Sequence, residues 1–156
     1  MSVQLIFSTR KGIFSKLVRF ITWSHYSHVD MIVGGDHIIG ASVLHGVEEV
    51  SLAYRKSVSH RWVIGEVPTI AAEDDDNIYR ALKSQVGKPY DWFGILGFLF
   101  HRDWQNEDRW FCSELIAWAF DKVGTRILAD SVRKSRVSPE HLLMSPMIKI
   151  TEKSYE

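Results

Sequence analysis

The pattern of apolar and polar positions divides the chain into a strand-rich first half and a helix-rich second half. Short runs with strand character cover residues 3–7, 29–33, 37–43, 47–52 and 62–67. Gly34-Gly35-Asp36 supplies a hairpin turn, because glycine adopts the positive φ that tight turns require. Between the first two runs, Ile13 to Trp23 has apolar residues at helical spacing, with Lys16 and Arg19 on the other side. The first half therefore predicts an antiparallel sheet interrupted by one helix.

Helical patterns dominate the second half of the chain. A linker opens at Pro68, and residues 71–86 predict a helix whose early carboxylates suit the helix dipole. Residues 111–123 predict another helix that Gly124 ends, Ser138-Pro139-Glu140 begins a short helical turn, and residues 147–151 predict a closing strand. We expect one α+β domain over residues 1–156, with an antiparallel sheet packed against helices. Its sheet half spans about residues 1–67 and its helical half about residues 71–145.

Composition narrows the classes of function only a little. Nineteen basic residues balance nineteen acidic ones, so no global charge draws the chain to nucleic acid or to an anionic membrane. The N-terminal apolar stretch is too short for a signal peptide, and the run from Trp92 to Phe100 is too short to span a bilayer. We expect a protein that is cytoplasmic as synthesised, without a transmembrane segment, and read the run as a core or lid segment. A lipid contact or substrate wall is the alternative. Nothing implies a cofactor or an oligomeric state.

The candidate chemistry centres on the only cysteine, Cys112, which rules out an internal disulfide and suits a reducing compartment. Cys112 stands where an apolar helical segment begins. A helix N-terminus stabilises a thiolate, because its free N–H groups and the macrodipole favour negative charge. An isolated cysteine is more often a buried small hydrophobe. The sequence around Cys112 therefore allows either a packing role or a nucleophile.

A thiol needs a base, and His28 is the best placed of the seven histidines, at the start of a strand that leads into the glycine hairpin. A metal site formed by His25, His28 and Asp30 is the competing interpretation. On a strand, His28 and Asp30 share a face while His25 points to the other. We therefore expect no metal site.

The residue that would orient His28 is not obvious from the sequence. The hairpin places position 41 or 42 opposite His28, so the cross-strand candidates are Gly40, Ser42 and, less directly, His45. No carboxylate falls at these positions. A dyad, or a triad completed by a backbone carbonyl or by a residue from elsewhere, both remain open. The backbone N–H of Cys112 can serve as an oxyanion donor.

Three ordered motifs resemble the circularly permuted, NlpC-type branch of the papain-like superfamily. Tyr26-Ser27-His28-Val29, the glycine hairpin, Gly40-Ala41-Ser42 and Gly46-Val47 resemble its histidine half. Its nucleophile half is matched by residues 87–92 (Gly-Lys-Pro-Tyr-Asp-Trp) and 110–115 (Trp-Phe-Cys-Ser-Glu-Leu), and Ser138-Pro139 with Leu142 resembles its closing element. The order, histidine before cysteine, is the permuted one. The motifs are also similar to those of small proteins encoded by tailed phages and prophages.

This resemblance implies that Cys112 is the nucleophile and His28 the base. It places the family's third polar residue near Gly40, which has no side chain, so Ser42, His37 or a water is the substitute that the resemblance allows. Supporting roles fall to four residues near the nucleophile motif: Asp91, Trp110, Ser113 and Glu114.

We expect a cysteine hydrolase that cleaves an amide bond in a cell-wall peptide through an acyl-enzyme, delivered to the wall by lysis or with a virion. One alternative is a lipid- or acyl-directed thioesterase or acyltransferase, for which an apolar tunnel beside Cys112 would be the sign. The other is a non-catalytic binding or virion-structural protein that retains the fold.

Overall fold

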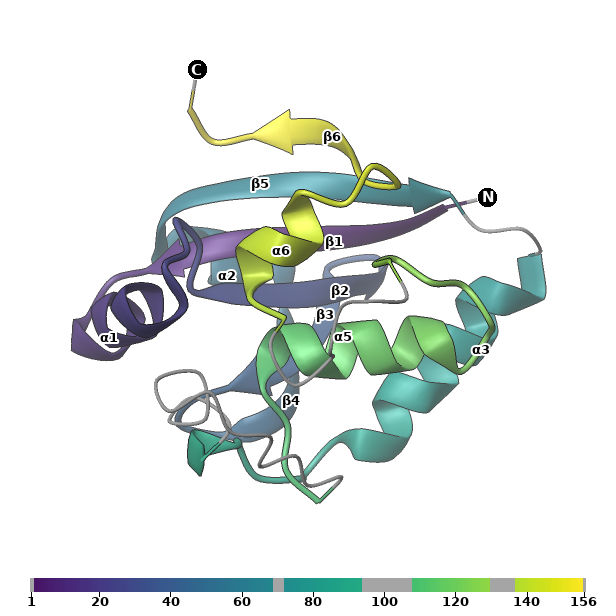
Figure 1. Cartoon of the computed structure of the whole chain (residues 1–156), viewed down its shortest axis with the longest axis horizontal. Helices are drawn as coiled ribbons and strands as arrows, with labels where there is room; N and C mark the ends of the chain where they lie inside the picture. Colours follow the sequence, from purple (N-terminus) through teal and green to yellow (C-terminus); the bar gives the residue numbers. More distant parts are fainter. Residues whose placement is uncertain (1, 69–71, 94–107, 130–136, 156) are drawn as a thin grey trace.

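The computed structural model describes residues 2–68, 72–93, 108–129 and 137–155. Its centre is one antiparallel sheet of six strands in the order β4-β3-β2-β1-β5-β6 (Figure 1). The strands are β1 (Ser2–Arg10), β2 (His28–Gly34), β3 (His37–Ser42), β4 (Gly46–Ser51), β5 (Ser59–Pro68) and β6 (Lys149–Lys153). The expected α+β class with an antiparallel sheet is confirmed.

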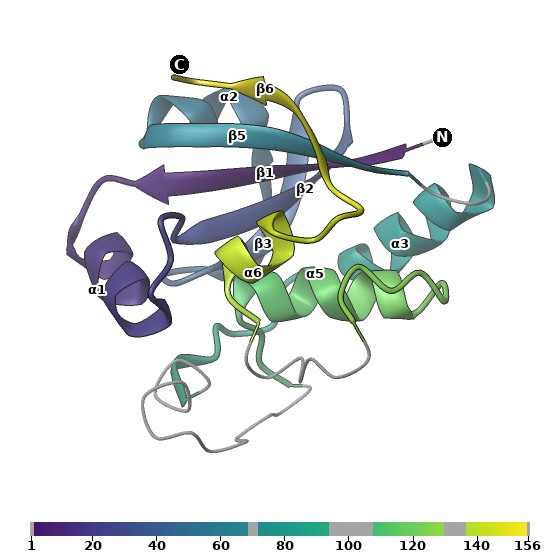
Figure 2. The same cartoon turned by 45° about the horizontal axis from the view of Figure 1, so that its top comes forward.

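Helices cover the two faces of the sheet unequally (Figures 1 and 2). One face carries α3 (Ala72–Gln85), α5 (Cys112–Asp121) and α6 (Pro139–Leu143), while the short α2 (Leu52–Ser57) lies on the other. The remaining helix, α1 (Ile13–Thr22), lies beyond the end of the sheet where β1 finishes and β2 begins. None of the described helices is both long and apolar enough to cross a bilayer.

The alternation of side chains along β2 assigns its residues to two different cores. Val29 and Met31 belong to the large core that includes Leu115 and Phe120 of α5. The intervening positions point the other way: Ile32 packs with a smaller cluster of Ile6, Ile38 and Ile64 on the opposite face. His28 and Asp30 share the orientation of Ile32, so they leave the strand on the face away from α5.

Strands β2 and β3 separate at one end, and this is the main irregularity of the sheet. Their ladder runs from Gly34↔His37 only as far as Met31↔Ile39. Beyond that point, Gly40 to Ser42 pair with β4 alone. Val29 therefore lies past the last β2–β3 pair, although β3 stays close to it: a Cβ at Gly40 would lie 3.1 Å from the Val29 carbonyl oxygen.

The apolar pattern does not predict α2. It predicts a strand over residues 47–52 and no helix directly after that strand. The helix is set by polar contacts that the apolar pattern does not report. The Ser51 hydroxyl accepts from the backbone N–H of Tyr54, and Asp36 accepts from the N–H of Ala53 at 2.9 Å. Because Asp36 lies in the β2–β3 turn, this hairpin and α2 are joined directly.

The start of α5 is positioned by the segment that precedes α5 and by β4. Tyr90 forms a parallel bridge with Trp110, two residues before Cys112. The same segment contacts β4, since the Val47 N–H donates to the Lys88 carbonyl at 2.8 Å. Gly46 has a φ of +71°, and a Cβ there would lie 2.1 Å from that carbonyl oxygen. The close approach of β4 to this segment therefore requires glycine.

We predict that Gly46→Ala lowers the free energy of unfolding by about 3 kcal/mol or more, because it combines left-handed strain with a backbone clash. Gly35→Ala is the matched control: its φ is +58°, but nothing lies within 4 Å of the added Cβ. It should cost only about 1–2 kcal/mol. Urea denaturation of both variants measures the difference, and equal losses would contradict the close approach.

Candidate functional site

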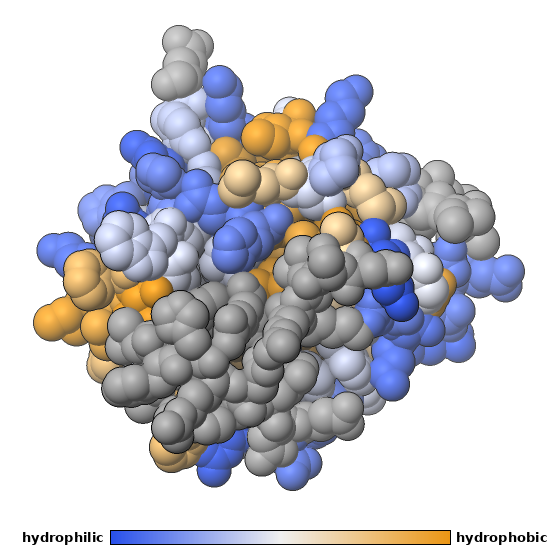
Figure 3. Space-filling model, viewed as in Figure 1, coloured by the Kyte–Doolittle hydropathy of each residue, from blue (hydrophilic) through white to orange (hydrophobic). Residues whose placement is uncertain are grey.

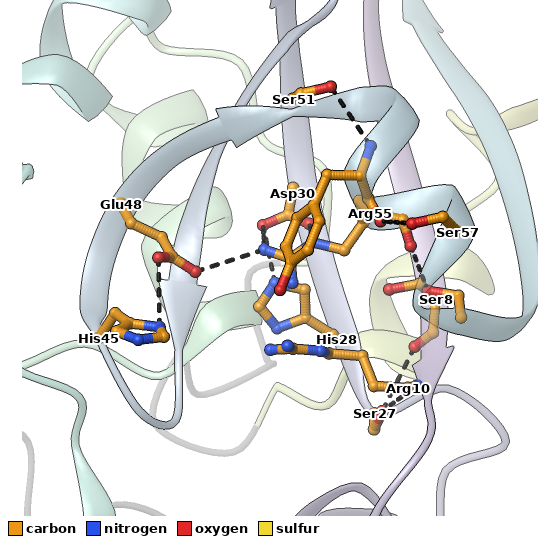
Figure 4. A network of polar contacts seen from close by, with 12 residues as sticks. Ser8, Arg10, Ser27, His28, Asp30, His45, Glu48, Ser51, Arg55 and Ser57 are labelled. Atoms are coloured by element: carbon orange, nitrogen blue, oxygen red, sulfur yellow. Dashed lines mark hydrogen bonds and ion pairs between the residues drawn. The ribbon is translucent and has the colours of Figure 1, made fainter.

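Asp30 lies at the centre of a buried polar cluster on β2 (Figure 4). Its Oδ1 lies 2.7 Å from Nε2 of His28, and its Oδ2 lies 2.9 Å from Nε of Arg55. His28 is 4% exposed, and Asp30 and Arg55 are fully buried. A histidine whose far nitrogen meets a buried carboxylate has its ring orientation and tautomer fixed.

Gly40 provides the space that Asp30 occupies. A Cβ at position 40 would lie 1.9 Å from Asp30 Oδ1 and 2.9 Å from its carboxyl carbon. Position 40, where the resemblance implies a third polar residue, has no side chain, and the carboxylate of Asp30 on the neighbouring strand occupies that space. Asp30 is also the residue that contacts Nε2 of His28.

Arg55 comes from α2 and is held beneath Asp30 by the contacts that cap this helix. Its Nη2 also lies 3.6 Å from Oε1 of Glu48 on β4. The hydrogen bonds to Ser51 and Ala53 hold the pKa of Asp36 below its usual range, which keeps this helix cap charged. A cation buried without a partner is costly, so Arg55 and Asp30 depend on each other.

The charges of the cluster follow from its burial. Burial alone would raise the pKa of Asp30, but the charges of His28 and Arg55 outweigh it and hold that pKa below its usual value. Burial lowers the pKa of His28 despite the attraction of Asp30, and Arg55 and Arg10 lower it further. At neutral pH, His28 is therefore a neutral imidazole beside an ionised carboxylate. Its Nε2–H donates to Asp30, which leaves the lone pair on Nδ1.

Cys112 begins α5. The backbone of Val29, the residue after His28, is near enough to its sulfur to lower the pKa of the thiol. Asp30 is near enough for its charge to act on the thiol. The thiol and the imidazole thus approach from opposite faces of the sheet where its strands separate. Among the described contacts, no hydrogen bond joins Cys112 to His28.

The sequence left both a buried and a nucleophilic Cys112 open, and the structure buries its thiol completely. Burial raises the pKa of the thiol to about 12, and the backbone groups of Val29, Ser113 and Cys112 offset this only in part. Desolvation of the buried sulfur thus opposes the thiolate that a helix N-terminus favours. The resting site holds a neutral thiol and a neutral imidazole.

Two of the residues proposed to orient His28 have other roles in the structure. Ser42 is fully buried, but its hydroxyl accepts from the His45 N–H at 3.3 Å and so closes the β3–β4 turn. His37 is exposed at the far end of the hairpin, with Nδ1 3.6 Å from Glu49. Neither contacts His28, because Asp30 occupies its Nε2.

The four residues predicted to support the nucleophile are buried around the first turn of α5 and the segment before it. Trp110 donates from its indole to Gln85 at 3.0 Å, and its ring lies 5.0 Å from that of Trp118. The Ser113 hydroxyl donates to the carbonyl of Val137. Asp91 and Glu114 are 2% and 5% exposed. Trp110 and Ser113 thus anchor the start of α5 rather than contact His28.

His25 does not join His28 and Asp30. It lies in the loop before β2, 71% exposed, with Nδ1 2.7 Å from Glu140 at the start of α6. Within the described part of the chain, no group of three or more His, Cys, Asp or Glu side chains is arranged to hold a metal ion.

A pocket of about 100 Å³ opens beside His28 at the end of the sheet. Its walls are largely apolar and come from α1 and the β3–β4 turn, and two cationic residues that precede α1 also line it. The lining includes Arg10, Lys11, Phe14, Val18, Val43 and Leu44. The pocket therefore combines an imidazole with a small apolar chamber and positive charge. Most of the apolar run from Trp92 to Phe100 lies outside the described residues, although Trp92 meets Phe14 edge-on at 5.7 Å between ring centroids.

Comparison with solved structures finds a close match in overall fold. The crystal structure of the metalloprotein YiiX from Escherichia coli O157:H7, of the uncharacterised family DUF1105, superposes with a TM-score of 0.75. The match covers 100% of this chain and 98% of the other at 20% identity, so the likeness shows a shared fold. No protein-family model and no curated protein matches the sequence.

We predict that Asp30→Asn lowers the free energy of unfolding at pH 7 by about 3–5 kcal/mol, because it leaves Arg55 buried without its charged partner. The folded pKa of Asp30 lies below the unfolded value, so its contribution is complete above about pH 4 and is lost as the pH falls through the folded pKa. Urea denaturation at pH 7 and at pH 3 should show the gap to wild type narrowing in acid.

The matched control for Asp30→Asn is Glu152→Gln, which removes an exposed ion pair with Lys56 and should cost less than about 1 kcal/mol. A loss at Asp30 as small as that at Glu152 would contradict the buried pairing.

We also predict that iodoacetamide alkylates native Cys112 at pH 8 at least about a hundredfold more slowly than a free thiol, because the folded pKa is far above the usual ~8.5. In urea the rate should rise to that of an ordinary cysteine. Mass spectrometry follows the modification, with Cys112→Ala as the blank. If native Cys112 reacts faster than a free thiol at pH 7, its pKa is lowered rather than raised, and this prediction is contradicted.

Proposed function

We propose that this chain is a cysteine-dependent acyl-transfer hydrolase with a permuted papain-like arrangement, in which Cys112 is the nucleophile, His28 the base and Asp30 the positioning residue. The observation that carries the proposal is the buried His28–Asp30–Arg55 chain beside the sulfur-bearing start of α5. A purely structural histidine would not need a buried carboxylate and arginine behind it, because ion pairs in a core are costly.

The proposed reaction starts from neutral groups. As the sulfur of Cys112 attacks the substrate carbonyl carbon, the thiol proton passes to Nδ1 of His28, and the new imidazolium is stabilised by Asp30. The imidazolium then protonates the leaving group, and a thioester remains on Cys112. Water, deprotonated by His28, attacks the thioester, releases the acid and restores the thiol. Substrate binding has to bring Cys112 and His28 into hydrogen-bond reach, since catalytic contacts are often long in unliganded enzymes.

The developing oxyanion has donors available at the start of α5. The backbone N–H groups of Cys112 and Ser113 lower the pKa of the thiol, so they act favourably on negative charge at this position. No side chain caps this helix at Phe111. Donors placed beforehand in a buried site stabilise a transition-state charge by several kcal/mol in typical enzymes.

The apolar pocket favours a substrate that carries a hydrocarbon acyl group. Phe14, Val18 and Val43 line the chamber next to His28, and Arg10 and Lys11 belong to the same lining. Cys112 does not line this pocket, so the apolar surface lies beside the proposed base rather than beside the sulfur. An apolar chamber at the base favours the lipid- or acyl-directed alternative over the cell-wall amide, which would call for an open polar groove. A volume of about 100 Å³ accommodates a short chain segment rather than a folded peptide.

The test is hydrolysis of p-nitrophenyl esters of increasing acyl length alongside a muropeptide amide, with intact-mass detection of an acyl-enzyme. We expect ester hydrolysis that depends on chain length and a covalent adduct on Cys112. Cys112→Ala should abolish both, and His28→Gln should lower kcat/KM about 10²–10⁴-fold.

His37→Gln and Ser42→Ala are the matched controls, because both lie outside the proposed triad and should retain wild-type rates. Preferential cleavage of the muropeptide would instead support the cell-wall amide. If no substrate forms an adduct on Cys112, and His28→Gln changes nothing, the protein is a binding or structural member of the fold.

A further inference from the structure

Helix α1 carries its bulkiest apolar side chains on the outside of the molecule. Ile13, Leu17 and Phe20 follow one another at helical spacing and are 75%, 45% and 72% exposed. In Figure 3 they contribute to the apolar patch at the end of the molecule where Figure 1 shows α1. A surface helix of a globular protein normally turns such a stripe toward the core.

The inward side of α1 is correspondingly polar. Ser15 and Thr22 are buried there, and their hydroxyls donate to Ser27 at 2.7 Å and to the carbonyl of Val18 at 2.8 Å. Val18 and Ile21 supply the remaining inward contacts. The helix is thus attached to the protein by a small mixed surface, and its outward stripe is not a by-product of filling the core.

Trp23 extends this stripe at a conformational cost. It follows α1 in the left-handed conformation, with φ 52° and ψ 34°, where glycine is the usual residue. Its indole is 89% exposed and stacks on Phe20 with ring centroids 6.5 Å apart. A tryptophan held outward in a strained conformation gains nothing from the core of its own protein.

The charged residues of this stretch of the sequence are all basic. No aspartate or glutamate occurs before position 30, whereas Arg10, Lys11, Lys16 and Arg19 all fall in or next to α1. A shallow hollow of about 300 Å³ is lined by Lys16, Arg19, Phe20 and Ser24. Nε of Arg19 is buried and has no hydrogen-bond partner among the described residues. This hollow offers cationic donors directly beside the aromatic stripe.

We propose that α1 docks the protein onto an anionic lipid bilayer, with Ile13, Leu17, Phe20 and Trp23 in the interfacial layer and Lys16 and Arg19 on lipid phosphates. The combination matches a helix that lies in the plane of a membrane surface: a bulky apolar face, a tryptophan, and basic residues as the only charged side chains of the helix itself. A soluble protein partner with an apolar groove would not require these cations. The nearby carboxylate of Glu140 is bound to His25 rather than to Lys16 or Arg19.

The same helix forms a wall of the pocket next to His28, through Phe14 and Val18. With α1 on a bilayer, the mouth of that pocket opens close to the lipid headgroups. The docking proposal rests on α1 itself and holds whether or not Cys112 is catalytic. If both proposals hold, an acyl chain reaches the site directly from the membrane.

The experiment is co-sedimentation of the full chain with vesicles of phosphatidylcholine, with or without phosphatidylglycerol. We expect binding only to the anionic vesicles, weakened by salt. Phe20→Glu should lower the partition coefficient at least about tenfold, because it places a charge in the apolar layer. Lys16→Gln should lower it about fivefold, the effect of one lost cation near an anionic surface.

Met144→Glu is the matched control, since Met144 is 74% exposed but follows α6 rather than α1, and this variant should bind as wild type. Cys112→Ala should also bind as wild type, which separates docking from catalysis. Absence of binding to anionic vesicles would overturn the proposal, as would equal weakening by Phe20→Glu and Met144→Glu. A dimer in solution that Phe20→Glu converts to monomer, without vesicle binding, would show that a second copy covers the stripe.

Discussion

The arrangement of the candidate site depends on one buried carboxylate. Asp30 is ionised in a region without solvent, and it remains so because Arg55 lies on one side of it and His28 on the other. Such a pair contributes little net stability compared with an apolar core, but it is costly to break. The ion pair therefore constrains the elements around it. Helix α2 has to place Arg55 beneath Asp30, with the β2–β3 turn capping that helix. The imidazole of His28 has to keep the tautomer that donates to Asp30. The side chains of His28, Asp30 and Arg55 thus join β2 to α2, although Asp30 and Arg55 are 25 residues apart in the sequence.

The end of the β2–β3 ladder near Met31 bears on how the buried cluster is connected to Cys112. If the ladder continued past Met31↔Ile39, the N–H of Val29 would be available to a partner strand, and Cys112 would face a closed sheet. Instead, the ladder ends there, and the thiol at the start of α5 is near enough to the backbone of Val29 for this backbone to lower its pKa. Burial keeps both groups neutral in the resting state. A buried, neutral thiol reacts slowly with oxidants and alkylating reagents.

Much of the fold was accessible from the sequence, since alternation along the strands, glycine turns and helical spacing are local signals. The ladder pairing Met31 with Ile39 shows the kind of register that the glycine hairpin was expected to set. Asp30 was overlooked as an orienting residue, although its separation of two from His28 already placed both on one face. The candidates for this role were taken from the neighbouring strand, around Gly40, and not from the strand that carries His28. Arg55 could not be found, because α2 has too few residues for a periodic pattern and its position depends on capping by Asp36. The outward face of α1 was equally hidden: an apolar stripe has the same spacing whether it faces core or solvent.

The contact between Gly40 and Asp30 also couples two positions in the history of this sequence. A side chain at position 40 and a carboxylate at position 30 compete for one volume, so a protein of this fold can hold one or the other but not both. Passing between the two arrangements requires a pair of substitutions, and one of the single intermediates leaves Arg55 facing no carboxylate. In this chain, the glycine at position 40 and the carboxylate at position 30 therefore form a single structural feature, because one provides the space that the other fills.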